Sequence, residues 1–429
     1  MRLSSRRAIM TAVAVAAFAA VAVIGLVLGR WPGAVSRLLP DDSSRIEQVA
    51  CVLNTPRRAT LRNALLVTNI VNALPTRCKV TILTNDRSFL KVVSNPDPER
   101  VSFVDLPPEA SCSIWPQDPF LILQNPDGSH CLLSSRTFER ADDRLVPDRL
   151  AAYLGWDHRK SRFAFEGGNI VCGRRHVFIG AGTVRINATT MNLTEAEVVR
   201  GLQRELGRPV LVVGSLPQTA AHIDMILTPL DERRLVLADA GWGARLARRE
   251  LDRDPQSVER FERSCEEYYF GDPSIHEIKD PAGRVLRPPQ VVGQAAHAVE
   301  DSEAIAPSLQ AIAAQLSQSG YEVRRVPYLF RLPPELRRTS VDASGPARSP
   351  EGEDFQPDYP CLTYNNVLIE TEGGAPTVYL PLYGWPAMDS AAVEAWQKLG
   401  CRVVPVEGFA VCSMYGGSLR CCVKVLSRR

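Results

Sequence analysis

The sequence predicts an α/β protein built from five similar strand–helix modules. At five places an amphipathic helix ends and a β-rich strand follows at once, near Pro75, Gly155, Gly207, Gly320 and Gly400. A glycine directly after a periodic helix favours the left-handed conformation that ends helices. A chain of repeated modules forms a solenoid or a closed ring, and the uneven spacing here argues against a regular solenoid.

The composition is that of an ordinary globular protein. Of 429 residues, 45% are hydrophobic and 23% are charged, and the formal net charge is only +2. These values lie within the usual range for folded domains. The small net charge gives no indication of a polyanionic partner. No basic stripe alternates with aromatic residues, so nucleic-acid binding is not expected.

The N-terminus carries a separate signal. Residues Ile9 to Gly29 form an uncharged apolar run, which Arg2, Arg6 and Arg7 precede. About 20 apolar residues can span a bilayer as a helix, and basic residues before the span favour export of the chain beyond it. A cleavable signal peptide is the alternative, but its apolar core is usually only about 7 to 15 residues long. We therefore expect an uncleaved anchor at residues 1–30, hence a single-pass membrane protein whose remaining chain is extracytoplasmic.

The remaining chain divides by composition. Residues 31–47 read as a linker, and residues 48–429 as one domain that contains the five modules. A charged, partly helical stretch near 241–300 and a Ser-, Gly-, Pro- and Asp-rich stretch near 338–360 are expected to be insertions. Within the domain, Thr194 and Glu197 have the spacing of a capping box at the start of a helix.

Five short motifs follow the modules in order. They are WPQD (115–118), FEGGN (165–169), HID (222–224), TYNN (363–366) and GGSLRC (416–421). Together they supply a cysteine, a histidine and several carboxylates, which suit covalent chemistry at a cationic carbon centre. Each motif alone is a weak signal, and the ordered set is more specific. A spacing of two residues on a strand would place His222 and Asp224 on the same face.

In this order the motifs resemble those of the guanidino-group modifying superfamily. Its members include arginine, agmatine and protein-arginine deiminases, dimethylarginine hydrolases and amidinotransferases. The resemblance runs from about residue 48 to the C-terminus. It implies the pentein fold, a five-bladed α/β-propeller of ββαβ-type repeats, and it implies neither a metal nor a cofactor.

The resemblance also implies roles for the motif residues. Asp118 and Asp224 resemble the carboxylates that hold the substrate guanidinium, whose planar fork of donors a carboxylate matches with two hydrogen bonds. Glu166 resembles the glutamate beside the catalytic histidine and the substrate. His222 resembles the proton-transfer group, and Cys421 the nucleophile.

Other residues near the motifs have less definite expectations. Trp115 can cover the substrate by a cation–π contact, and Asn366 resembles an asparagine that borders the active site. Arg420 stands where the family has a histidine, although a neighbouring arginine can itself lower the pKa of a thiol. Cys422 is the alternative nucleophile, but the register of the motif favours Cys421.

The resemblance implies hydrolysis of a guanidino group, the deimination of an arginine-type substrate. The Cys421 thiolate attacks the guanidinium carbon, His222 protonates the departing amine, and water then hydrolyses the covalent intermediate. Two alternatives stay open: an amidinotransferase, in which an amine replaces the water, and a non-catalytic pentein that only binds a guanidino ligand. The sequence does not distinguish a small-molecule from a peptidyl guanidino substrate, and it leaves the oligomeric state unknown.

Overall fold

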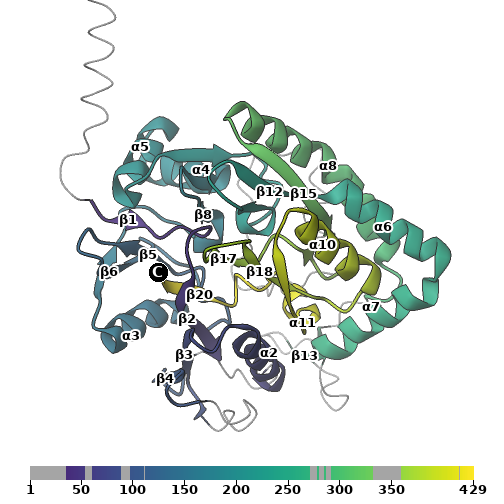
Figure 1. Cartoon of the computed structure of the whole chain (residues 1–429), viewed down its shortest axis with the longest axis horizontal. Coiled ribbons are helices and arrows are strands. Elements are labelled where there is room, and N and C mark those ends of the chain that lie inside the picture. The colour runs from purple at the N-terminus through teal and green to yellow at the C-terminus, as the bar shows by residue number, and fades with distance from the viewer. Residues whose placement is uncertain are drawn as a thin grey trace, which may run out of the picture.

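The computed structural model describes residues 35–429 except 54–59, 88–96, 111, 271–277, 280–284, 287–290, 332–358 and 415 (Figure 1). Within this part of the chain, the strands form five sheets of three or four strands and one two-stranded ribbon. The ribbon consists of β13 (Ile278–Lys279) and β14 (Val285–Leu286). These five larger sheets correspond to the five strand–helix modules predicted from the sequence.

Each of the five sheets contains the same arrangement of three strands. A first strand pairs antiparallel with a second, and one or more helices then lead to a third strand that is parallel to the second. The first sheet contains β1 (Arg37–Leu38), β5 (Phe120–Gln124), β6 (His130–Ser134) and β7 (Asp157–Lys160), with η2 (Asp142–Arg144) and α3 (Leu145–Leu154). The second contains β8 (Ile170–Cys172), β9 (Val177–Gly180) and β10 (Val210–Val213), with η3 (Gly167–Asn169), α4 (Ala181–Met191) and α5 (Glu195–Leu206).

The third and fourth sheets contain the same three-strand arrangement with different helices. The third contains β11 (Leu227–Pro229), β12 (Arg234–Asp239), β15 (Glu322–Leu329) and β16 (Leu362–Thr363), with η4 (Ile223–Met225), α6 (Ala240–Arg253), α7 (Pro255–Phe270) and α8 (Ala295–Gln318). The fourth contains β17 (Leu368–Glu370), β18 (Thr377–Pro381) and β19 (Arg402–Val406), with α10 (Pro386–Lys398).

The fifth sheet joins the two ends of the described chain. It contains β20 (Lys424–Arg428), β2 (Ile46–Leu53), β3 (Lys79–Thr84) and β4 (Val101–Asp105), with α2 (Thr60–Ala73) between β2 and β3 and α11 (Ala410–Ser413) before β20. Its first strand therefore comes from the C-terminus and its second from the N-terminal part, and the two pair antiparallel. In Figure 1 the purple and yellow ends of the colour scale meet at β2 and β20.

Local signals in the sequence account for many element ends. The glycines that follow the predicted helices have positive φ angles: 66° at Gly155, 65° at Gly207, and 84° at both Gly320 and Gly400. Because glycine has no Cβ, it adopts this conformation without strain. The capping box at the start of α5 is present, since the Thr194 side chain accepts from the Glu197 N–H and the Glu197 side chain accepts from the Thr194 N–H.

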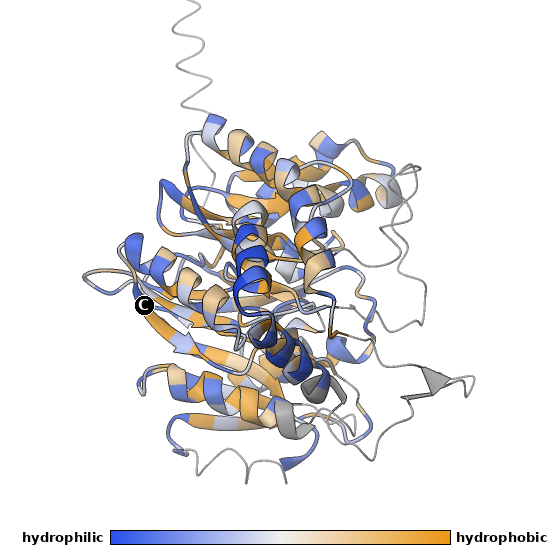
Figure 2. Cartoon of the chain, turned by 90° about the vertical axis from the view of Figure 1, so that its right-hand side faces the viewer, coloured by the Kyte–Doolittle hydropathy of each residue, from blue (hydrophilic) through white to orange (hydrophobic). Residues whose placement is uncertain are grey.

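The core lies between the sheets and the helices that cover them. All residues of β9 and of β18 are buried, as expected for strands covered on both faces. Figure 2 shows hydrophobic residues along the strands and hydrophilic residues on the outward surfaces of the helices. The largest fully buried side chains, Trp385 and Trp396, lie at the start and near the end of the α10 segment.

The predicted membrane-anchored localisation is wrong. Within the described part of the chain, no helix is long and apolar enough to cross a bilayer. Even α8, with 24 residues, carries Glu300 and Asp301 and packs on β12 and β15. The predicted span, Ile9 to Gly29, lies outside the described residues. The single-pass topology, the extracytoplasmic catalytic domain and the membrane as a partner are therefore withdrawn.

Candidate active site

The five motifs occupy equivalent positions in the five sheets. Each motif comes just before the first strand of its sheet, and these strands are β5, β8, β11, β17 and β20. Backbone hydrogen bonds connect neighbouring motifs: the Gly167 N–H donates to the Asp118 carbonyl at 2.8 Å, and the Gln117 N–H donates to the Cys421 carbonyl at 3.5 Å. Segments far apart in the sequence therefore meet at one place.

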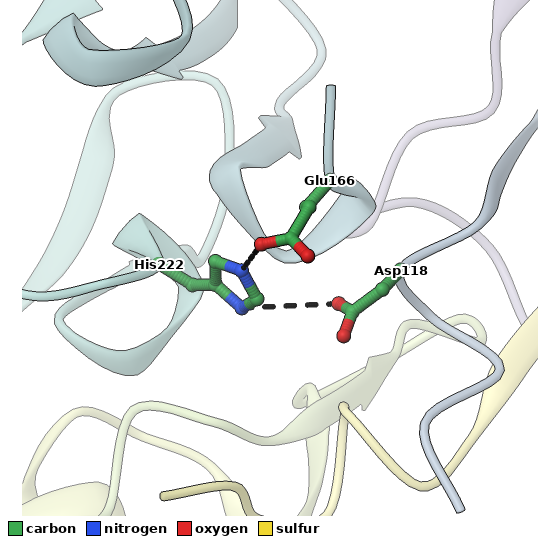
Figure 3. Close-up of side chains that lie close together, drawn as sticks. All are labelled: Asp118, Glu166 and His222. Atoms are coloured by element: carbon green, nitrogen blue, oxygen red, sulfur yellow. Dashed lines mark hydrogen bonds and ion pairs between the residues drawn. The ribbon is translucent and has the colours of Figure 1, made fainter. Parts of the chain in front are cut away.

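Three of the predicted residues form a compact cluster (Figure 3). Nε2 of His222 lies 2.6 Å from Oε2 of Glu166, and Nδ1 lies 3.8 Å from Oδ1 of Asp118. The imidazole thus stands between two carboxylates that come from two other sheets. Asp118 is 3% exposed, whereas the Glu166 side chain is 41% exposed and reaches the surface.

The two glycines of the FEGGN motif make this close approach possible. A Cβ on Gly168 would lie 2.4 Å from Nδ1 of His222, and a Cβ on Gly167 would lie 2.0 Å from the Gln117 carbonyl oxygen. Real Cβ atoms do not come this close to other heavy atoms. The absence of side chains at these two positions lets the motif lie against both His222 and the Asp118 segment.

His222 and Asp224 do not share a strand face, contrary to the expectation from their spacing. His222 has extended backbone angles and precedes the short 3₁₀ helix η4, which contains Asp224. A 3₁₀ turn has about three residues per turn, so a residue two positions on points elsewhere. His222 consequently faces Glu166, and Asp224 faces Arg420.

The carboxylates set the charge of His222. Burial alone would lower its pKa, but the charge of Asp118 and the hydrogen bond to Glu166 outweigh burial and raise it. Burial alone would raise the pKa of Glu166, but the hydrogen bond and charge of His222, with the charge of Arg140, lower it. At neutral pH the pair is therefore an imidazolium and a carboxylate.

Asp118 has a basic partner that the sequence analysis did not find. Nη2 of Arg140 donates to Oδ2 of Asp118 at 2.7 Å, and Nε donates to Asp143 at 2.6 Å. Nη1 lies 4.0 Å from the nearer oxygen of Glu166. Arg140 belongs to none of the five motifs, and no local signal separates it from Arg144, four residues further along the chain.

Asp224 lies at the buried end of the site. It is 0% exposed, and its Oδ2 accepts from Nη1 of Arg420 at 2.7 Å. Burial raises the pKa of Asp224, and the positive charge of Arg420 opposes this effect. Nη2 of Arg420 turns the other way and donates to Asp41. The arginine that replaces the family histidine is therefore held between two carboxylates.

Cys421 lies beside Asn366. The Cys421 N–H donates to Oδ1 of Asn366 at 3.1 Å, and Nδ2 of Asn366 lies 3.4 Å from the Asp224 carbonyl oxygen. Asn366 thus fixes the backbone of the cysteine relative to that of the aspartate. Burial raises the pKa of the Cys421 thiol, and the charges of Asp224 and Asp118 raise it further.

Cys422 points into a different part of the core. Residues 420–422 form a turn and not a strand. Cys421 belongs to the core cluster that contains Ile223 and Met225, whereas Cys422 belongs to the separate core cluster that contains Trp385 and Trp396. Sγ of Cys422 lies 3.6 Å from Sγ of Cys412. This environment is that of a structural thiol and separates Cys422 from the carboxylates.

Trp115 packs against the loop that leads to the cysteine. A Cβ on Gly417 would lie 2.4 Å from Cη2 of Trp115, so the indole ring fills the space that a side chain would take. The ring is partly buried between the two core clusters. Trp115 therefore couples the WPQD segment to the GGSLRC segment by packing.

Lys424 is a second basic side chain that the sequence analysis did not find. It is 4% exposed and donates to the carbonyl oxygens of Gln117 and Phe120. Burial and the nearby charge of Arg420 lower its pKa to about 7. Lys424 thus binds the backbone on both sides of Asp118.

The cluster of Figure 3 also has the residue types of a metal site. Single ligand atoms of Asp118, Glu166 and His222 lie within 4.8 Å of one another. However, the guanidinium of Arg140 already donates to Asp118 and lies beside Glu166. These carboxylates are thus arranged around a planar, nitrogen-bearing cation, the geometry in which carboxylates bind guanidinium groups.

Comparison with solved structures identifies the fold. The C. jejuni agmatine deiminase has a TM-score of 0.56 at 14% identity and covers 93% of this chain and 99% of its own. The agmatine deiminase of Enterococcus faecalis gives 0.55 at 14% identity, with 93% and 99% covered. A substrate-bound cysteine-to-serine variant of the C. jejuni enzyme gives 0.57 at 13% identity, with 92% and 98% covered. The chain thus has the α/β pentein-like fold.

Sequence comparison identifies the family. The Porphyromonas-type peptidyl-arginine deiminase family matches residues 58–425, and the chain belongs to that family. No curated protein matches the chain in sequence. The protein is accordingly a hydrolase that deiminates a guanidino group by cleaving its C–N bond, and the predicted resemblance is confirmed.

Proposed function

We propose that Asp118 and Asp224 clamp the guanidinium of the substrate while Cys421 attacks its carbon. One observation carries the proposal. Each aspartate uses Oδ2 for an arginine of the protein, while Oδ1 is buried and has no hydrogen-bond partner among the described residues. An unsatisfied buried carboxylate oxygen is costly, and a substrate guanidinium would satisfy both.

The charges favour a cationic substrate and link its binding to activation of the thiol. Without substrate, burial and the two aspartates keep the pKa of Cys421 high, so the thiol is neutral. A bound guanidinium brings a positive charge between the same aspartates and offsets their effect. The thiol then releases its proton to water, because protonated His222 cannot accept it. The thiolate thus forms where the electrophilic carbon lies, which limits reaction with other electrophiles.

His222 supplies the proton transfers. Its raised pKa keeps it protonated at neutral pH, and it can pass that proton to the nitrogen that leaves. The carbon–nitrogen bond breaks, ammonia or an amine departs, and a thiouronium remains on Cys421. Neutral His222 then takes a proton from water, which attacks the same carbon, and the thiol is released with a ureido product. Glu166 holds the imidazole in place throughout.

We also propose the finer architecture implied by the family. Residues 48–429 form one catalytic domain, a five-bladed propeller, with insertions near 241–300 and 338–360. The equal strand pattern of the five sheets and the pairing of β20 with β2 support this arrangement. In such a ring the loops before β5, β8, β11, β17 and β20 would all open at one central mouth.

The deciding experiment is a product assay on the full-length protein. Free arginine, agmatine, methylated arginine and a peptidyl-arginine are each supplied, and both the ureido product and the released amine are measured. We expect turnover with at least one substrate and none with the Cys421→Ala variant. Product that requires an added amine would indicate an amidinotransferase. Absence of turnover with all four, together with tight binding of one, would replace the proposal by a binding protein.

A further inference from the structure

A short N-terminal segment contacts the site through Arg420. Residues 36–45, here called the strap, precede the part of the chain that matches the family. The strap is held by arginine side chains that donate to its carbonyls: Arg208 to Leu38 at 3.0 Å, and Arg428 to Asp41 at 2.9 Å. The Asp41 N–H also donates to the Cys172 carbonyl at 2.7 Å. The strap therefore delivers Asp41 to a fixed position.

Asp41 shares one guanidinium with Asp224. Nη2 of Arg420 donates to Oδ1 and Oδ2 of Asp41 at 3.2 and 3.1 Å, while Nη1 donates to Oδ2 of Asp224 at 2.7 Å. Nη2 also donates to the Ile170 carbonyl at 3.3 Å. The two ends of the guanidinium thus point to different carboxylates. This leaves Oδ1 of Asp224 without a partner among the described residues.

Without the contact to Asp41, the guanidinium of Arg420 would bind Asp224 in a different geometry. Its planar fork matches a single carboxylate with two parallel hydrogen bonds, which is the strongest common arrangement. If Nη2 of Arg420 were not held by Asp41, Arg420 could donate to both oxygens of Asp224. The protein would then occupy the oxygen that the substrate needs.

We propose that Asp41 is a positioning residue for substrate binding: it holds Nη2 of Arg420 away from Asp224, so that Oδ1 of Asp224 stays available to the substrate guanidinium. This inference rests on the proposed function of Asp224 as a substrate carboxylate. It explains how an arginine can replace the family histidine beside Cys421 while Oδ1 of Asp224 stays without a partner among the described residues. Asp41 and Arg420 act as one unit, although the first lies in the strap and the second beside the nucleophile.

The first test is Asp41→Asn in the full-length protein. Arg420 then competes with the substrate for Asp224, and competition raises KM but is overcome at saturation. We expect KM to rise about 10-fold to 100-fold, the equivalent of one charge-assisted hydrogen bond, with kcat within about threefold of the wild type. The matched control is Asp42→Asn, the same change one residue along the strap, since Asp42 is fully buried and lies nearest to Arg174. The control should keep the wild-type KM.

The double variant Asp41→Asn with Arg420→Gln separates positioning from a general structural effect. Without Arg420 no group competes for Asp224, so KM should return to within about threefold of the Arg420→Gln single variant. A loss of the strap structure would instead leave KM of the double variant at least as high as that of Asp41→Asn. An unchanged KM in Asp41→Asn, an equal rise in Asp42→Asn, or no recovery in the double variant overturns the inference.

Crystal structures of the wild type and of Asp41→Asn test the same point without turnover. We expect Arg420 to bridge residues 41 and 224 in the wild type and to bind both oxygens of Asp224 in the variant. Arg420 remaining in its wild-type position would contradict the inference. If the wild type has no activity on any guanidino substrate, the proposed function fails, and these two structures still decide where Arg420 is held.

Discussion

The imidazole of His222 lies between Asp118 and Glu166, and this position determines its charge. Both carboxylates raise its pKa above the ordinary value of 6.5. The raised pKa also stabilises the folded protein. That contribution is complete below pH 6.5 and is lost as the pH rises through the higher pKa of the folded state. The same charges that prepare His222 for catalysis thus stabilise the fold most at neutral and acidic pH.

Glu166→Gln should lower the pKa of His222, because it removes one of the carboxylate charges that raise it, the one that is also hydrogen-bonded to the imidazole. In the proposed mechanism His222 must be protonated when the amine departs, so its deprotonation sets the alkaline limb of the kcat profile. We expect that limb to move to lower pH in the variant. The measurement is kcat across pH, with Glu195→Gln as the control, since Glu195 is exposed and paired with Arg185. An unmoved alkaline limb would assign the proton transfer to another group.

The two adjacent cysteines should respond oppositely to truncation. Cys421→Ala should abolish both turnover and covalent labelling by a haloacetamidine, while leaving the fold intact. Cys422→Ala should keep most of the activity but lower the free energy of unfolding by about 1 kcal/mol, because it removes a buried sulfur that packs against Cys412. Turnover, labelling and urea denaturation of both variants give the comparison. The reverse ranking would make Cys422 the nucleophile.

The sequence predicted candidate site residues that the structure brings together, and it missed Arg140 and Lys424, the basic residues that contact this region. Asp118, Glu166 and His222 were predicted because their motifs, in this order, resemble those of the guanidino-group modifying superfamily, and the structure brings the three side chains together. Arg140 was missed because it lies 22 residues after Asp118 in a segment without a motif. Its role depends on a contact across space that no local pattern encodes.

At the scale of single elements, the turns that carry the motifs matter more than the strands after them. The FEGGN and HID motifs both end in short 3₁₀ helices, η3 and η4. Helix ends were predicted well, because glycine and capping-box signals act locally. The relative directions of the His222 and Asp224 side chains were predicted wrongly. A three-residue 3₁₀ turn has no sequence signature that distinguishes it from the start of a strand.

Gly168→Ala should impair the site through this turn. The new Cβ would lie 2.4 Å from Nδ1 of His222, so the imidazole has to move. A displacement of about 1 Å can cost about 100-fold in rate, and we expect kcat to fall by about that factor. The circular dichroism spectrum should stay unchanged. Gly374→Ala is the control, since its nearest neighbour would be 3.8 Å away; equal losses in both variants would rule out a specific effect on His222.

At the scale of the whole molecule, the two ends of the described chain stabilise one another. β2 and β20 pair in one sheet, and the backbones of Arg45 and Arg429 exchange two hydrogen bonds of 3.1 Å. The strap adds Asp41, whose partner Arg420 lies 379 residues away. Such pairings depend on the topology and not on local patterns, so the sequence showed strand–helix modules but not the strap.

Arg428, in β20, connects the strap to β17, and its replacement should lower the stability of the whole protein. Although only 9% exposed, its guanidinium donates to four carbonyl oxygens. Three of these carbonyls belong to the strap, and the fourth is that of Ile369 in β17. In Arg428→Met these acceptors lose their donor, and we expect the free energy of unfolding to fall by about 2 to 4 kcal/mol.

Urea denaturation of the full-length protein measures this change, with Arg429→Met as the control. The Arg429 side chain is exposed, so its replacement should alter stability by less than about 0.5 kcal/mol. Because the strap carries Asp41, the KM of Arg428→Met should also rise. Its kcat should change by a smaller factor than its KM. Equal stability of the two variants would mean that the strap is only loosely attached. The position of Asp41 would then have to be set by Cys172, whose N–H donates to Oδ2 of Asp41 at 2.8 Å. The same contact would then keep Oδ1 of Asp224 available to the substrate.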